Sequence, residues 1–410
     1  MGVSQFARSI SESPTMALNE QARMLREQGE SIVHLGIGEP QNKAPQAAID
    51  TAASALAGGK IKYTPTTGIP SFKKAVIRYT EENYGRTVSP KSVIVCAGAK
   101  QAIFNALWAI LDPGDEVILL APYWVSYPEM VKMCRAVPVV VTPADGTLTP
   151  SFDRIERAVT PRTRAIIVNS PNNPSGMVFS RDLVGELVRF CEERGIHAIM
   201  DDIYHKLVFD GVKAPSCYEF STRDTNASSL IVVNGIAKTY GMTGFRIGWA
   251  IASQEIVSAM GTLQSQTTSC TSSLCQLAAQ GAMLGPQDEV EGLRKSMEHN
   301  RDVIVAELAK VPRVSVIKPA GTFYCLPDFS GCFKAGIAKN SFELAMFLLS
   351  KVRVVTVPGR DFGLEGYLRL SYAGSTAEVL EGIERIRWAL DPAAPKEMRI
   401  GERTVVRDWL

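Results

Sequence analysis

The chain has 410 residues, with 44 Lys and Arg against 42 Asp and Glu and a formal net charge of +2. This length is enough for two lobes with a large core, and the charge balance offers no general attraction to nucleic acid or to an anionic membrane. We therefore expect neither partner, and any anionic ligand has to be bound by a local site.

The cysteines and the N-terminus point to the reducing interior of a cell. No Cys-x-x-Cys pair and no metal-ligand spacing occurs, so we expect reduced cysteines, mostly in the core, and no metal site. The eight cysteines are Cys96, Cys134, Cys191, Cys217, Cys270, Cys275, Cys325 and Cys332. The first residues show neither a charged-then-apolar signal nor a membrane-spanning run, and no Ser or Thr stands at position 6 for myristoylation of Gly2. A cytoplasmic protein is the expectation.

Short runs rich in Val and Ile alternate with amphipathic stretches between about residues 91 and 253. This alternation is typical of a mainly parallel sheet with helices on both faces, so we predict the α/β class and a seven-stranded sheet buried on both sides. The predicted strands are Ser92–Cys96, Glu116–Leu120, Val137–Val141, Arg164–Asn169, Ala198–Asp201, Leu230–Asn234 and Ile247–Ala252.

Two crossover helices are marked by their start and stop signals. Residues 100–111 place Ile103, Leu107 and Ile110 on one face, and Asp112-Pro113-Gly114 ends the pattern. The second helix is expected between a capping Ser180 and a terminating Gly195.

The pattern changes at about residue 287 to a charged helix at 290–310, two apolar strand candidates and a last helix, which predicts a smaller α+β domain. We divide the chain into residues 1–45, packing with the small domain, 46–286, the large domain, 287–390, the small domain, and 391–410. The last stretch contains Pro392, Pro395 and several charges, so we expect a loosely held tail of unknown role.

The segment from Asn234 to Trp249 follows a predicted strand and holds one lysine and one arginine among small and apolar residues. Desolvation lowers the pKa of a lysine, and a neutral amine can attack an aldehyde, which makes Lys238 a candidate nucleophile. The planar guanidinium of Arg246 could clamp a phosphate. A surface lysine and a structural arginine would fit this segment equally well.

Two further segments begin where predicted strands end, the place where sheets of this class bind ligands. Asp201 ends one strand, and a buried carboxylate needs a cationic partner; the alternative is a cap on the following helix. The other segment, Asn169-Ser-Pro-Asn-Asn173-Pro-Ser-Gly176, presents Asn173 as a donor from a rigid loop, although its residues also suit a plain turn.

Two more features suit anions. Cys96-Ala-Gly98-Ala99-Lys100 joins a strand to a helix, whose free amides form an anion site; the absence of nucleotide-binding glycine patterns favours a single phosphate over a nucleotide. In Tyr367-Leu-Arg369-Leu-Ser-Tyr372, Arg369 points away from both leucines and could face a cleft and bind a carboxylate. The alternative for the first segment is a plain turn between strand and helix, and the alternative for Arg369 is a solvated arginine at the edge of a sheet.

Taken in their order along the chain, these five segments resemble the class I aminotransferases of fold type I. The resemblance covers nearly the whole chain, to about Leu390. The chain is most similar to bacterial aspartate aminotransferases of the branch that includes bifunctional aspartate/prephenate enzymes. Three stretches carry this similarity: Tyr63-Thr-Pro-Thr-Thr-Gly-Ile-Pro, Ala121-Pro-Tyr-Trp-Val-Ser-Tyr-Pro-Glu and Ser170-Pro-Asn-Asn-Pro-Ser-Gly.

The resemblance implies pyridoxal 5'-phosphate as cofactor, held in the large domain of a homodimer with shared active sites. It implies that Lys238 forms the Schiff base and then moves a proton between substrate and cofactor. Asp201 would pair with the ring nitrogen, which keeps the ring an electron sink. Asn173 and Tyr204 would hold the phenolate oxygen, and Trp124 would stack on the ring.

For the phosphate, the resemblance implies a cradle of Gly98, Ala99, Lys100 and Arg246, completed by Tyr63 of the neighbouring subunit. Its implied binding residues for the substrate α-carboxylate are Arg369, Gly38 and Asn173, with Trp124 alongside. For the side-chain carboxylate it implies Lys100, Ser13 and Thr15.

The chain departs from the resemblance at Gln41-Asn42, where an acidic residue is common, and at Ala237, where a serine is common. The implied reaction is a ping-pong transfer of an amino group from aspartate or glutamate to a 2-oxo acid such as 2-oxoglutarate or oxaloacetate. Aromatic or prephenate transamination is the alternative, followed by a lyase or decarboxylase of the same fold. A non-catalytic, DNA-binding regulator is disfavoured because residues 1–13 are too short for an added domain.

Overall fold

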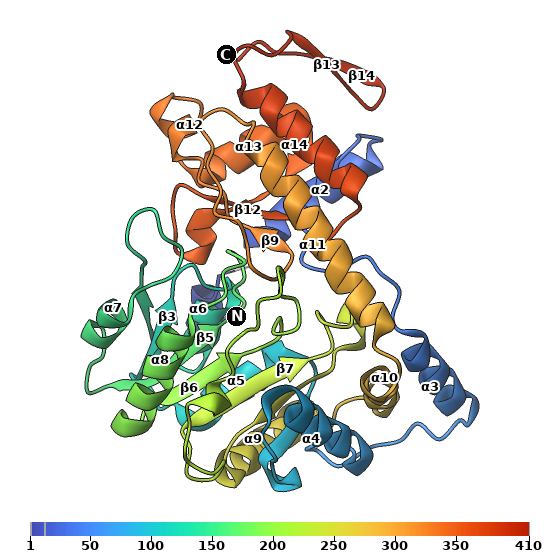
Figure 1. Ribbon diagram of the computed structural model, residues 1–410, viewed down its shortest axis with the longest axis vertical. Helices are drawn as coiled ribbons and strands as arrows, with labels where there is room; N and C mark the ends of the chain where they lie inside the picture. Colours follow the sequence, from blue (N-terminus) through green and yellow to red (C-terminus); the bar gives the residue numbers. More distant parts are fainter. Residues whose placement is uncertain (1, 12–13, 410) are drawn as a thin grey trace.

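A seven-stranded sheet forms the centre of the larger lobe, the lower one in Figure 1. The structure, a computed structural model, describes residues 2–11 and 14–409, without the side chains of residues 14–17. The strands of this sheet are β2 (Val93–Cys96), β3 (Glu116–Leu120), β4 (Val137–Val141), β5 (Thr163–Asn169), β6 (His197–Asp201), β7 (Leu230–Gly235) and β8 (Gly248–Ile251). Each predicted strand is present, with ends that differ by at most one residue.

The strand order is β2-β8-β7-β6-β5-β3-β4, and β8 alone runs antiparallel to its two neighbours, β2 and β7. Both faces are buried, because alternate residues of one strand join different apolar clusters. In β5, Ile167 packs with helices on one face, whereas Ile166 and Val168 pack with helices on the other. The prediction of a mainly parallel α/β sheet is confirmed.

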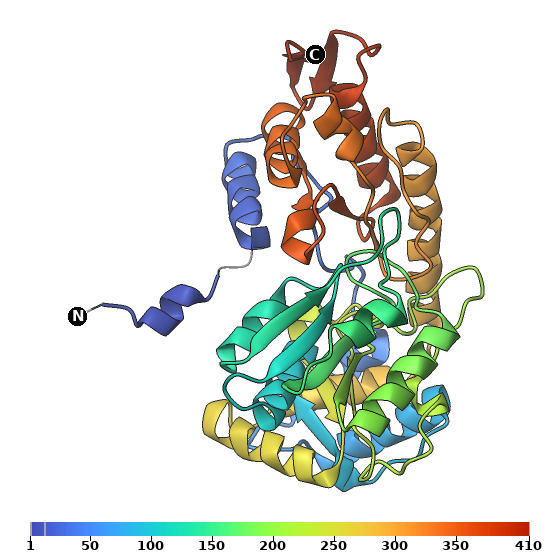
Figure 2. The ribbon, with the colours of Figure 1, turned by 90° about the vertical axis from the view of Figure 1, so that its left-hand side faces the viewer.

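Helices cover the sheet on both faces (Figures 1 and 2). Ser180 caps α8 and Gly195 ends it in the left-handed region with φ 66°, as predicted. The helices of this lobe are α3 (Gln46–Ala57), α4 (Pro70–Tyr84), α5 (Ala99–Ile110), α6 (Ser126–Met133), α7 (Phe152–Arg157), α8 (Arg181–Arg194), α9 (Gln254–Thr267) and α10 (Ser273–Leu284). Three short 3-10 turns join them: η1 (Pro90–Ser92), η2 (Cys217–Glu219) and η3 (Thr243–Phe245).

The smaller lobe begins with α11 (Asp288–Leu308), which runs upward from the sheet in Figure 1. Its remaining elements are β9 (Tyr324–Cys325), α12 (Ser330–Lys334), α13 (Ser341–Val352), β10 (Val354–Val355), β11 (Val357–Pro358), η4 (Gly359–Phe362), β12 (Leu368–Ser371) and α14 (Thr376–Leu390). Strands β11, β12 and β9 form an antiparallel sheet, in which β12 is central.

The N-terminal segment contacts both lobes. In α2 (Pro14–Glu27), Leu18 and Ala22 pack against Leu349 of α13, and β1 (Val33–His34) pairs in parallel with β10. The short α1 (Gln5–Ser9) has no buried residue and projects away from both lobes in Figure 2. Just after it, the Ser11 amide donates to Glu129 of α6 at 3.1 Å, so this contact is with the larger lobe.

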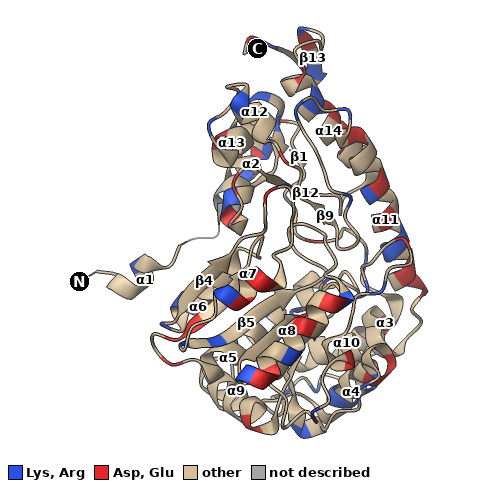
Figure 3. Ribbon diagram, turned by 60° about the vertical axis from the view of Figure 1, so that its left-hand side comes forward, with Lys and Arg blue, Asp and Glu red and all other residues tan. Residues whose placement is uncertain are grey.

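Charged residues of both signs are interspersed along the outer helices, as on α8 and α11 in Figure 3. Among the described helices, none combines the length and the apolar character needed to cross a bilayer.

The C-terminal residues form an ordered hairpin, β13 (Glu397–Ile400) and β14 (Arg403–Val406), so the expectation of a loosely held tail is wrong. The Trp409 ring packs edge-on against Trp388 of α14 and Phe347 of α13, and its Nε1 donates to the carbonyl of Ala389 at 3.1 Å. This burial outweighs the turn-forming prolines and the charges on which the expectation was based.

The hairpin also braces the N-terminal segment. Arg403 forms an ion pair with Glu30, three residues before β1, and Arg407 donates to backbone carbonyls at the end of α14, including that of Trp388 at 3.3 Å. Residues from the two ends of the chain are therefore joined across the small lobe.

We expect Trp409→Ala to lower the free energy of unfolding by roughly 1–3 kcal/mol, less than for a fully buried Trp because this ring is half-buried. Val406→Ala is the matched control, since Val406 belongs to the same hairpin and is 55% exposed. Denaturant titration of both variants checks this, and equal midpoints would show that the tail does not brace the lobe.

Candidate active site

A cavity of about 360 Å³ lies between the lobes, at the carboxyl ends of β5, β6 and β7. Because these strands are parallel, the residues that follow them gather at one edge of the sheet. The larger lobe contributes Asn169, Asn173, Asp201, Tyr204, Ala237 and Lys238, and the other side of the cavity is lined by Asn19, Gly36, Gly38, Tyr324 and Arg369.

Lys238 lies in the loop after β7, and its Nζ donates to the carbonyl of Gly38 at 2.5 Å. Burial lowers the pKa of Lys238 to about 8, with a further contribution from the positive charge of Arg369. About a tenth of this amine is therefore neutral at pH 7, far more than for an ordinary lysine, and the neutral state is the one in which an amine is a nucleophile and a base.

Asp201 ends β6 and is 4% exposed. Burial raises its pKa to about 6, although the hydroxyl of Tyr127, which donates to Oδ2 at 2.6 Å, favours the ionised form. A buried carboxyl with this pKa stays ionised if a cationic group binds beside it. The sequence reasoning missed Tyr127, because only the docking of α6 on the sheet brings it to Asp201.

Arg369 of β12 is 5% exposed, and its neighbours Leu368 and Leu370 point into the core, as the alternation predicts. Nη1 donates to Asn173 Oδ1 at 3.1 Å, and Nη2 donates to the Gly36 carbonyl at 3.0 Å. Its Nε has no partner in the described part of the chain, and no carboxylate there forms an ion pair with the Arg369 guanidinium.

Burial lowers the pKa of Arg369, as expected for a desolvated cation. The ring of Tyr324, 4.3 Å from the guanidinium carbon, packs over it and lies 6.1 Å from the ring of Tyr204. An unpaired buried guanidinium is costly, and a carboxylate ligand satisfies it best because the two groups match in charge and shape. Sequence reasoning missed Tyr324, which has no distinguishing motif around it.

The start of α5 forms a cradle for an anion. A Cβ on Gly98, which has φ +91°, would lie 2.5 Å from Arg246 Nη2, and a Cβ on Gly248 would lie 2.3 Å from the Ala99 amide nitrogen. The first amides of a helix have no carbonyl partner within the helix, and the guanidinium approaches them only because both positions are glycine.

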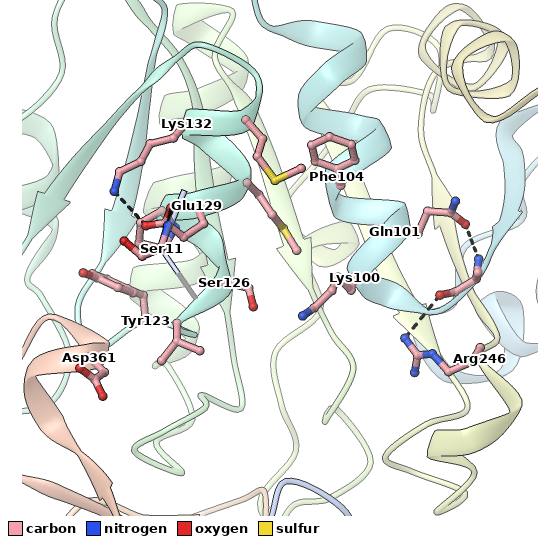
Figure 4. Close-up of a pocket in the computed structure, with 15 residues that line it drawn as sticks. Ser11, Lys100, Gln101, Phe104, Tyr123, Ser126, Glu129, Lys132, Arg246 and Asp361 are labelled. Atoms are coloured by element: carbon pink, nitrogen blue, oxygen red, sulfur yellow. Dashed lines mark hydrogen bonds and ion pairs between the residues drawn. The ribbon is translucent and has the colours of Figure 1, made fainter. Parts of the chain in front are cut away.

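A second cavity of about 650 Å³ adjoins the first and shares Lys100, Val125, Ser126 and Arg246 with it (Figure 4). Figure 4 shows Lys100 and Arg246 at one end of α5, with Glu129, Ser11 and Lys132 across the space. The Lys100 Nζ lies 4.8 Å from the centre of the Trp124 ring, and partial burial and Arg246 lower the pKa of Lys100. The side chain of Lys100 thus lies between the two cavities.

The structure does not bring every candidate to this site. Tyr63 is 91% exposed and lies beside Cys270 and Thr271, away from the cavity of its own chain. Ser13 and the side chain of Thr15 lie outside the described residues.

Comparison with known proteins identifies the family of the chain. The model of the family described as "Aminotransferase class I and II" matches residues 30–386. The chain belongs to this family. It is 36% identical to an aspartate aminotransferase of Geobacillus stearothermophilus, covering 96% of the chain and 100% of the relative. It is 38% identical to an aspartate/prephenate aminotransferase of Thermus thermophilus, with the same coverage.

Solved structures show the same aminotransferase fold. The aspartate aminotransferase of Thermus thermophilus with maleate has a TM-score of 0.87 at 38% identity, covering 94% of this chain and 99% of that one. The enzyme from Rhizobium meliloti has a TM-score of 0.89 at 33% identity, covering 95% and 99%. This protein is therefore an aminotransferase, with the large and small lobes of fold type I.

We expect the Lys238 amine to titrate near pH 8 in the apoprotein, because burial and Arg369 disfavour its ammonium form. Labelling by a small amine-reactive reagent, quantified at Lys238 by mass spectrometry, should rise with pH to half its maximum near that value. A midpoint near 10.5, the ordinary value, would contradict the desolvated environment.

Proposed function

We propose that this aminotransferase uses pyridoxal 5'-phosphate to move an amino group from aspartate or glutamate to a 2-oxo acid such as 2-oxoglutarate or oxaloacetate, by a ping-pong mechanism in the cytoplasm. The buried Arg369, without a carboxylate partner and in the same cavity as Lys238, is the observation that carries this proposal. A substrate carboxylate supplies the missing partner and directs the Cα of an amino acid toward the lysine.

The residues present fit the cofactor. The cradle of Gly98, Ala99, Lys100 and Arg246 suits its phosphate, and the buried Asp201 suits its ring nitrogen. Once bound, pyridoxal phosphate supplies an aldehyde for the amine and a ring that withdraws electrons from the substrate Cα.

Each side chain then has a defined task. Lys238 would hold the cofactor aldehyde through Nζ and, once substrate displaces it, Nζ would take the proton from the substrate Cα. Because Asn173 Oδ1 accepts from Arg369, its amide N–H groups would be available to the phenolate oxygen of the cofactor, which Tyr204 of the same cavity would also hold. Trp124 would pack against the cofactor ring.

Tyr127 is the positioning residue for Asp201, because its hydroxyl holds one carboxylate oxygen ionised and in place.

The assembly proposed is a homodimer in which Tyr63 of one subunit completes the phosphate site of the other. The full exposure of Tyr63 on its own chain supports this arrangement, because a large aromatic side chain at 91% exposure has no partner there.

The decisive test is a half-reaction panel, in which purified holoenzyme is mixed with single amino acids and the cofactor is followed by absorbance from its aldehyde to its amine form. We expect the fastest conversion with aspartate and glutamate, and none for Lys238→Ala. Fastest conversion with aromatic donors would favour the alternative, aromatic or prephenate transamination, of which prephenate is named for the Thermus relative. No conversion with any donor would refute the proposal.

Gly98→Ala should weaken pyridoxal phosphate binding roughly tenfold or more, the value of a charge-assisted hydrogen bond, because the new Cβ displaces Arg246. Gly244→Ala is the matched control two residues before Arg246, since its Cβ meets nothing within 4 Å. Equilibrium titration of each apoprotein with the cofactor measures the difference, and equal affinities would remove Arg246 from the phosphate site.

A further inference from the structure

Asn19 is a polar residue of the active-site cavity to which no role has been assigned above. It is an exposed residue of α2, within the N-terminal segment, and it lines the cavity together with Arg369 and Lys100. Its Oδ1 lies 2.9 Å from Nε2 of His34.

The proton on His34 can be assigned from its other nitrogen. The Gly36 backbone amide donates to Nδ1 at 3.2 Å, and an amide N–H can only donate, so Nδ1 carries no proton. Burial lowers the pKa of His34 to about 4, and Arg26 and Arg369 add to this effect, so the ring is neutral. The one ring proton is therefore on Nε2, which donates to Asn19 Oδ1.

This donor fixes the orientation of the Asn19 amide. A flipped amide would place its NH₂ group against the Nε2–H of His34, and two donors would face each other. The Asn19 NH₂ group therefore points away from His34, and it donates to no acceptor in the described part of the chain. Two N–H donors are thus held ready for a ligand.

Gly36 links His34, and through it Asn19, to Arg369 by hydrogen bonds. The Gly36 carbonyl accepts from Arg369 Nη2 at 3.0 Å, while its amide donates to His34. Gly36 fits between them because it lacks a side chain: a Cβ there would lie 3.2 Å from His34 Cε1. The two donors of the cavity, Arg369 and Asn19, are therefore fixed relative to each other.

We propose that Asn19 binds the distal carboxylate of a dicarboxylic substrate and that His34 is its positioning residue. Arg369 and Asn19 both line the cavity, but Arg369 is buried, whereas Asn19 is exposed. A substrate held by Arg369 at its α-carboxylate and by Lys238 near its Cα has only its side chain to extend outward. Asn19 then adds a neutral, oriented donor to the positive charge of Lys100.

This inference rests on the proposed function. The variant Asn19→Asp tests it, because aspartate and asparagine side chains have nearly the same size and shape. The aspartate still accepts from His34, so the helix and the hydrogen bond are kept, but it presents a negative oxygen to the substrate carboxylate. We expect kcat/KM for aspartate and glutamate to fall roughly tenfold or more relative to that for alanine. An equal loss for alanine, or no loss for the acidic donors, would overturn the role of Asn19.

His34→Phe tests the positioning role, because it keeps a ring of similar size and removes the donor to Asn19. The ratio of kcat/KM for glutamate to that for alanine should fall in the same direction, by less than for Asn19→Asp, since the amide is then free to rotate. An unchanged ratio would remove His34 from the proposal.

Maleate binding separates this inference from the proposed function. The dissociation constant of maleate, a dicarboxylate without an amino group, can be measured by calorimetry on holoenzyme in the absence of turnover. Tighter binding to the wild type than to Asn19→Asp supports the assignment even if no amino acid is converted, a result that would refute the proposed reaction alone. Equal affinities would refute the assignment of Asn19 whatever the panel shows.

Discussion

The parallel register of β5, β6 and β7 is the constraint on which the active site depends. It places Asn169 opposite Asp201 and Asp201 opposite Val233, so the loops that follow the three strands begin at one edge of the sheet. The Asn169 side chain reinforces the register by donating to the Asp201 carbonyl at 2.9 Å, and its Oδ1 accepts from the Asn173 amide at 2.8 Å. Segments far apart in the chain thereby line the same side of the cavity.

The charges of the cavity are strongly unbalanced. Arg369, Lys238, Lys100 and Arg246 bring four basic groups, against which Asp201 is the one acidic side chain among the described lining residues. Such an excess is unfavourable in a desolvated site unless anionic ligands balance it, and together with burial, the larger cause, it lowers the pKa of Lys238. The phosphate proposed at Arg246 and the carboxylate proposed at Arg369 would balance this charge.

The smaller lobe depends on both ends of the chain. Arg369 and Tyr324 come from its central sheet, but Gly36, Gly38 and Asn19 come from the N-terminal segment, which pairs with β10 and packs on α13. The C-terminal hairpin joins these parts through Arg403 and Trp409. Catalysis depends on holding the substrate and the reacting groups in a precise geometry. Packing far from the cavity therefore contributes to it by fixing the segments that line the cavity.

Local patterns in the sequence determined the elements and the identity of many lining residues. The β-branched runs place each strand of the large sheet within a residue of its observed ends, and the positions of Lys238, Asp201 and Asn173 after strands follow from chain order. Tertiary structure alone decided which groups contact these residues: Tyr127 contacts Asp201, Tyr324 packs over Arg369, and His34 donates to Asn19. It also brings together Trp388 and Trp409, which hold in place a C-terminal segment whose sequence shows only prolines and charges. The reason is physical. Periodicity and turn chemistry act between neighbours in sequence, whereas desolvation and hydrogen-bond geometry depend on groups that the fold brings together from distant positions.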